Sequence, residues 1–159
     1  MEPEFPGGSY PLCSPIPYHT VDFLSVQFGA VFNPEIVAVL PVGLEIIPGS
    51  CQVAYPTGTV FVDIPDPQDL GNNRFLWEIA TLNDAIGLNG LPGFTSEPEN
   101  QLQIRFETTA NCDFIAGSYI IFEASGEQNC PDRTNNLTKA GEPINIDGAA
   151  PPYLSLIHI

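Results

Sequence analysis

The chain has 159 residues, of which 19 are acidic and four are basic, so its formal charge at neutral pH is −15. A chain with so few cations lacks the basic stripe that neutralises phosphates, which excludes nucleic-acid binding and attraction to anionic lipid. Its hydrophobic content of 43%, with ten phenylalanines, provides enough apolar surface for a core and excludes a disordered acidic tail.

The N-terminal part contains no helical pattern. Five prolines fall within residues 1–19, which predicts an extended lead-in, because proline removes a backbone donor and breaks helices. From Thr20 the apolar residues recur with a period of two, so that Leu24, Val26 and Phe28 share one face of a predicted strand.

Short strands separated by turns are predicted along the rest of the chain. The clearest is 101–107, where Leu102, Ile104 and Phe106 alternate with polar residues, as expected for a strand with one buried face. Other strands are predicted at 35–40, 44–47, 59–64, 75–80, 118–124 and 143–146. This spacing favours an all-β fold, a two-layer antiparallel sandwich over residues 20–147.

Two segments fall outside this pattern. The loop 83–100 is the longest, follows at most one helical turn, and is the expected place for ligand binding. Residues 148–159 are predicted to be a linker and the start of a following strand or domain. No apolar run is long enough to span a membrane, and the N-terminus lacks signal-peptide features, so we expect a piece of a longer protein.

The four cysteines are Cys13, Cys51, Cys112 and Cys130. They form no Cys-x-x-Cys pair, which argues against structural zinc, and their even number in an acidic, lysine-poor chain predicts two disulfides in an extracellular setting. Three pairings are possible. We favour Cys112–Cys130, which brackets one predicted strand, and therefore Cys13–Cys51. The alternative is four reduced thiols in the core.

One loop carries the residue pattern of a metal site. Asp63, Asp66 and Asp69 are spaced by three in a segment rich in proline and glycine, and carboxylate oxygens are the ligands that calcium prefers. The pattern matches no EF-hand loop, and acids that keep a sheet edge soluble are the alternative interpretation. A second, weaker acidic group consists of Glu97, Glu99 and Asp113.

The sequence contains no catalytic signature of a hydrolase, metalloprotease or nucleotide-binding enzyme, and we predict that it is not an enzyme. His19 lies within the proline-rich lead-in and is interpreted as a surface residue rather than a general base. Trp77 shares a strand face with Phe75 and Ile79, which predicts a core position rather than a sugar-stacking surface.

Several segments resemble a known family. The run Val39–Cys51, with its Leu-Pro-x-Gly-Leu motif at 40–44, resembles the conserved-repeat domain of bacterial surface proteins. Residues 75–79 and 102–106 resemble the following strands of that repeat. The segment 112–124, closing at Cys130, is similar to versions found in large secreted adhesins of gliding Bacteroidetes.

This resemblance implies an immunoglobulin-like sandwich repeated in a long cell-surface protein that acts in adhesion or gliding and is exported by type IX secretion. Its partners would be neighbouring domains of the same chain, surface glycans or other surface proteins. Two further hypotheses stay open. The first is a glycan-binding module that uses the 83–100 loop, with or without bound calcium, and the second is a non-catalytic domain attached to a secreted hydrolase.

Overall fold

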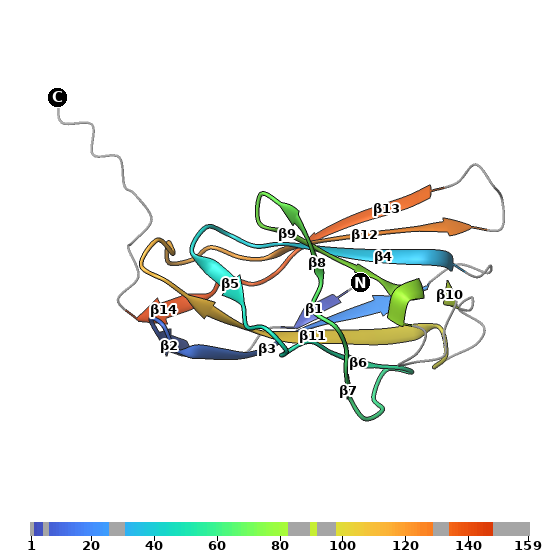
Figure 1. Cartoon of the computed structure of the whole chain (residues 1–159), viewed down its shortest axis with the longest axis horizontal. Coiled ribbons are helices and arrows are strands. Elements are labelled where there is room, and N and C mark those ends of the chain that lie inside the picture. Colours follow the sequence, from blue (N-terminus) through green and yellow to red (C-terminus); the bar gives the residue numbers. More distant parts are fainter. Residues whose placement is uncertain are drawn as a thin grey trace.

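The computed structural model describes residues 2–4, 7–25, 31–82, 90–91, 98–128 and 134–147. Over these residues the chain forms two antiparallel sheets that pack face to face, with a short third sheet at one end (Figure 1). The helical structure in this part is a single 3-10 turn, η1 (Ile79–Leu82), and no described helix is long and apolar enough to cross a membrane. The predicted all-β, two-layer antiparallel sandwich is confirmed.

The first sheet is built around a ten-residue strand, Gln101–Ala110, which pairs with three other strands. Its order is β1 (Glu2–Glu4), β3 (Pro15–Leu24), β11 (Gln101–Ala110), β6 (Gln52–Ala54) and β7 (Val62–Asp63), and β5 (Leu44–Ile46) pairs with the far end of β11. Every second residue of β11 is buried from Leu102 to Ala110, as the alternating pattern predicted. This strand therefore anchors one layer of the core.

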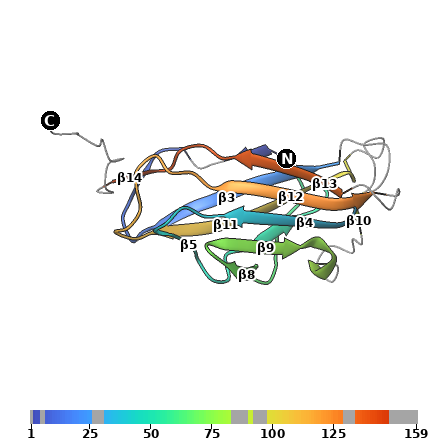
Figure 2. The ribbon, with the colours of Figure 1, turned by 90° about the horizontal axis from the view of Figure 1, so that it is seen from above.

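The second sheet packs against the first, with the core between them. Its order is β13 (Thr134–Ala140), β12 (Ile121–Gln128), β4 (Val31–Val39), β9 (Arg74–Glu78) and β8 (Gln68–Gly71), which lie side by side in Figure 2, and β10 (Gly90–Leu91) pairs with β4. A two-residue turn at Asn72 and Asn73 joins β8 to β9, and both residues have positive φ angles, 54° and 59°. Asparagine tolerates this conformation, which suits a tight hairpin.

The third sheet joins the two ends of the described chain. Strand β2 (Ser9–Pro11) pairs in parallel with β14 (Asn145–Asp147), at the end of the sandwich where Figure 1 places β14. The Ser9 Oγ donates a hydrogen bond of 2.6 Å to Asp147 Oδ1. The described residues before 20 thus contribute β1, β2 and the first half of β3 to the sheets, where a lead-in was predicted, and Ile16 in β3 is completely buried. Residues 148–159 lie outside the described part.

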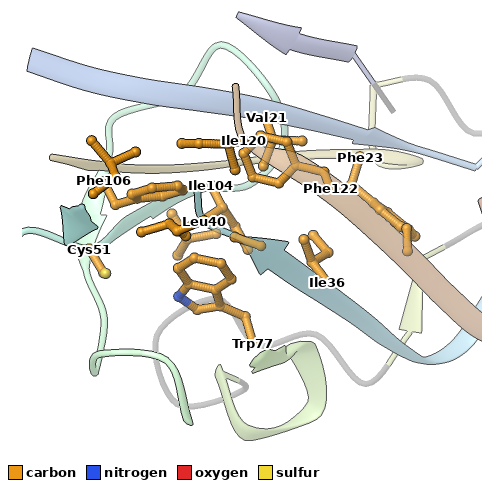
Figure 3. Packing of buried hydrophobic residues seen from close by; sticks show 14 of the residues in the cluster. Val21, Phe23, Ile36, Leu40, Cys51, Trp77, Ile104, Phe106, Ile120 and Phe122 are labelled. Carbon is orange, nitrogen blue, oxygen red and sulfur yellow. The ribbon is translucent and has the colours of Figure 1, made fainter. Parts of the chain in front are cut away.

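Aromatic side chains connect the two sheets at the centre of the core. Phe106 of β11 is completely buried, and its ring centroid lies 5.2 Å from that of Trp77 in β9 and 6.2 Å from that of Phe122 in β12 (Figure 3). Trp77 is 2% exposed, so its predicted core position is confirmed. The predicted strand around Trp77 thus directs this side chain into the core.

The Leu-Pro-x-Gly-Leu segment forms the turn between β4 and β5. The Leu44 N–H donates to the Pro41 carbonyl at 3.1 Å, and Gly43 has a φ of +82°, as expected at the third position of a type II turn. A Cβ atom added to Gly43 would lie 2.3 Å from the backbone nitrogen of Phe114. Glycine is required here both by the φ angle and by the close approach of the backbone after β11.

Candidate functional site

The three aspartates of the predicted calcium site have separate structural roles. Asp63 Oδ1 accepts a hydrogen bond of 2.7 Å from Gln52 Nε2 on the adjacent strand. Asp66, in the connection between β7 and β8, accepts from the Gly49 N–H at 2.8 and 3.1 Å. Asp69 in β8 accepts from the Gly71 N–H at 2.7 Å. Each carboxylate fixes a different loop or strand.

These three side chains do not form a group that could hold a metal ion, and no such group of histidine, cysteine, aspartate and glutamate exists among the described residues. The structure therefore does not support the predicted calcium site at Asp63, Asp66 and Asp69. The reason is that the segment runs from the edge of one sheet to the edge of the other, so that residues three apart are directed to different neighbours. In the second acidic group, Glu97 lies outside the described residues.

The predicted Cys13–Cys51 disulfide is not formed, and both residues are free thiols. The Cys13 N–H donates to the carbonyl of Ala110, whereas Cys51 precedes Gln52, which pairs with Arg105. The two cysteines therefore lie against points about 15 Å apart along β11. A disulfide needs Cα atoms within about 7 Å. Cys112 is an exposed free thiol, and Cys130, its predicted partner, lies outside the described residues.

Cys51 belongs to the core instead. Its side chain is completely buried close to Trp77, as Figure 3 shows. Burial, together with the neighbouring Asp66 carboxylate, raises the pKa of the Cys51 thiol to about 12. The thiol therefore stays protonated at neutral pH and packs as a small apolar side chain, as the alternative interpretation from sequence expected for the core.

A cleft of about 240 Å³ opens beside this part of the core. Its lining residues come from the connection between β7 and β8, from β9 and from η1: Pro65, Asp66, Pro67, Gln68, Leu76, Trp77, Glu78 and Thr81. Trp77 is the only buried residue among them, whereas Asp66 and Glu78 are exposed and therefore define the rim of the cleft. The cleft thus combines polar and apolar lining residues, and two of the polar ones are carboxylates.

The rim of the cleft carries uncompensated negative charge. Glu78 lies directly opposite Glu35 in the pairing of β9 with β4, and no described residue donates a hydrogen bond or forms an ion pair with the Glu78 side chain. Like charges at directly opposed positions destabilise a sheet. No lysine or arginine lines the cleft. Sequence analysis did not identify this site, because Asp66 and Glu78 are brought together by the connection between the two sheets.

The outer face of the first sheet carries a second feature that sequence analysis missed. The Arg105 guanidinium lies between two aromatic rings, 4.0 Å from the Tyr18 centroid and 3.7 Å from the Phe61 centroid. Its Nε–H also donates to Gln52 Oε1 at 2.8 Å. Cation–π contacts of this kind stabilise partly exposed sites. The stack connects β3, β11 and β6 to the segment before β7, and it gives this face a structural role.

His19, which sequence analysis placed on the surface, is 1% exposed. Its Nε2 lies 2.8 Å from the Thr108 Oγ1, and its ring centroid lies 5.6 Å from that of Phe106. The prediction was wrong because His19 belongs to β3 rather than to a lead-in, and it shares the buried face of that strand with Val21 and Phe23. The register shift between Phe106 and Thr108 then brings Ile16 to the same face.

Burial lowers the pKa of His19 from 6.5 to about 4, so the neutral ring is the folded form at pH 7. Because the unfolded chain binds this proton more tightly, the contribution of His19 to stability is complete above pH 6.5 and is lost as the pH falls towards 4. We expect a loss of about 3 kcal/mol over this range. Urea titrations of the wild type and of His19→Gln at several pH values measure this loss of unfolding free energy. The carboxylates contribute equally to the pH dependence of the two proteins, so the difference between them is due to His19. Parallel pH profiles of the two proteins would contradict it.

The loop predicted to bind ligands, 83–100, is described only at β10 and at residues 98–100, so residues 83–89 and 92–97 lie outside the described part. Among the described residues, the cleft beside Trp77 is accordingly the candidate binding site that the geometry supports best.

Comparison with known protein families and with curated proteins finds no match for the sequence. Among solved structures, the major pilin of Streptococcus agalactiae (35 kDa C-terminal fragment) has a TM-score of 0.54 at 16% identity, covering 86% of this chain and 51% of that one. A form of the major pilin BcpA of Bacillus cereus has a TM-score of 0.53 at 9% identity, covering 87% and 36%.

A third structure is matched over almost its whole length. The collagen-binding subdomain of the Enterococcus faecalis surface protein ACE has a TM-score of 0.51 at 9% identity, covering 90% of this chain and 92% of the subdomain. The chain spans about a third of the Bacillus pilin and half of the streptococcal fragment. At these identities the likeness concerns the fold, which is an immunoglobulin-like sandwich of the kind found in bacterial pilins and adhesins.

Proposed function

We infer that the chain is a non-catalytic module of a bacterial cell-surface protein, where it serves as a structural or adhesive unit. The observation that carries this proposal is the match of the whole sandwich to a complete subdomain of a surface adhesin and to single parts of two pilins. A fold alone does not define a function, so the proposal also depends on the chemistry of the described residues.

That chemistry favours a structural role. Among the residues whose burial the structure describes, the two buried titratable side chains are His19 and Cys51, and burial in the core holds both in their neutral forms. The aspartates of the β7–β8 region each fix a backbone or side-chain amide. A net charge of −15 keeps neighbouring modules soluble and apart.

Within this class, the resemblance of residues 39–51 to the conserved-repeat domain favours a large adhesin with neighbouring domains on the same chain. A gliding adhesin exported by type IX secretion is the specific form of this proposal. Its ligands would be glycans or proteins of another surface, and a matrix protein deserves testing because one structural neighbour is a collagen-binding subdomain.

Surface display is the direct test. Antibodies raised against residues 1–159 should label intact cells of the source organism, and brief treatment of the cells with a protease should remove the label. An antibody against a cytoplasmic protein is the matched control and should label permeabilised cells alone. Labelling of this chain only after permeabilisation would contradict the proposal.

A further inference from the structure

The cleft beside Trp77 has the size of one side chain rather than of a whole small-molecule ligand. Its volume is about 240 Å³, below the roughly 300–1,000 Å³ of sites that enclose a drug-sized molecule. Half of its lining residues are polar, and Pro65, Pro67, Leu76 and Trp77 contribute apolar surfaces beside them. These surfaces suit an aliphatic stem.

The rim of the cleft suits a cation. Two carboxylates, those of Asp66 and Glu78, lie on it, and Glu35 faces Glu78 on the next strand. Asp66 is already oriented by the Gly49 N–H, so it needs no reorganisation on binding. Glu78 has no partner among the described residues. A positive group at the rim would relieve the repulsion between Glu35 and Glu78 and would be attracted by the net charge of −15.

An unbranched stem with a terminal positive charge is the side chain of lysine, and arginine is its close relative. We propose that the cleft receives a lysine or arginine side chain from a basic, extended segment of a partner protein. The adjacent strand β8 is the edge of its sheet, and all four of its residues are exposed, so an extended segment has room beside the cleft. This inference rests on the proposed adhesive function, to which it adds the class of partner.

The single tryptophan of the chain makes the test direct. Trp77 is one of the residues that line the cleft, so its indole N–H resonance in a ¹⁵N-labelled sample should shift when a ligand binds there. The probe is N-acetyl-lysine methylamide, and the matched control is N-acetyl-norleucine methylamide, which has a similar stem without the charge. We expect the lysine compound to shift the indole resonance saturably, with weaker binding at high salt, and the norleucine compound to cause a much smaller shift.

Two variants locate the binding. Glu78→Gln removes one rim charge from an exposed residue without partners and should weaken binding about two- to fivefold, as expected for an exposed ion pair. Glu142→Gln removes the same charge from an exposed residue outside the cleft and should leave binding unchanged. A spectrum of each variant that retains the dispersed resonances of the wild type establishes that it is folded.

Three results would overturn the proposal: no saturable shift with the lysine compound, equal shifts with both compounds, or equal weakening by both variants. A saturable shift with galactose alone would assign the cleft to a neutral glycan instead. Because these measurements use the chain in solution, they are independent of surface labelling. Lysine binding without surface display would reject the proposed function alone, and surface display without lysine binding would reject the partner class alone.

Discussion

Replacing Gly43 by alanine should destabilise the protein by about 2–5 kcal/mol. A Cβ in the left-handed conformation costs about 1–2 kcal/mol, and overpacking adds about 1–3 kcal/mol. The overlap is severe because the atoms that the Cβ would meet, at 2.3 and 2.7 Å, belong to the backbone of Asp113 and Phe114, which cannot rotate away. Equilibrium unfolding in urea, followed by the fluorescence of Trp77, measures the loss.

Gly49 is the matched control for this experiment. It occupies the same position of a similar turn, with the Ser50 N–H donating to the Ile47 carbonyl and a φ of +74°, but no atom lies within 4 Å of an added Cβ. Gly49→Ala should therefore cost only the conformational part, about 1–2 kcal/mol. Equal losses for the two variants would mean that the contact between Gly43 and the 113–114 backbone has no energetic role.

Phe106→Ala should cost about 3–5 kcal/mol, the range observed when a buried phenylalanine is truncated. Phe106 is completely buried and contacts aromatic rings on both β9 and β12, so its removal leaves a cavity between the two sheets. Since the variant also alters the surroundings of Trp77, unfolding should be followed by far-ultraviolet circular dichroism as well as by fluorescence.

Phe75 provides the comparison for this truncation, because it is only half-buried at the edge of the core. Phe75→Ala removes the same atoms and should cost less than half as much, since water already reaches part of the ring. A loss as large as that of Phe106→Ala would show that the contact between the sheets is not centred on Phe106.

Strands with a regular apolar pattern were easier to predict than polar strands. Strand β11 alternates strictly between apolar and polar residues, because one of its faces is core and the other is solvent, and its position was predicted to within a few residues. Strand β13, in contrast, was missed. Its sequence, Thr-Asn-Asn-Leu-Thr-Lys-Ala, is polar except for Leu137 and Ala140, and the strand is defined by its pairing with β12 at the edge of the sheet.

Register explains the error at β3. The period-two pattern placed Leu24 on the buried face, but Leu24 is 36% exposed, whereas Val21 and Phe23 are buried. Both alternate sets contain apolar residues, so the pattern alone could not define the inward face. The bulge before His19 was likewise invisible in the sequence, because it is defined by pairing with β11 rather than by local residue preference.

The candidate site was beyond sequence reasoning for a related reason. The three regularly spaced aspartates attracted attention, but the chain between β7 and β8 crosses from one sheet to the other, which separates their side chains. The same crossing brings Asp66 close to Glu78, which lies twelve residues further along the chain, on the rim of one cleft. Only the arrangement of the two sheets combines them.

The parallel pairing of β2 with β14 has a mechanical consequence. Because the two strands run in the same direction, the chain enters β2 at one end of the pair and leaves β14 at the other. Tension applied between Ser9 and Asp147 would therefore pull the strands lengthwise past each other, and their hydrogen bonds would have to break together rather than one after another. This two-stranded sheet would thus resist a stretching force in its stronger direction.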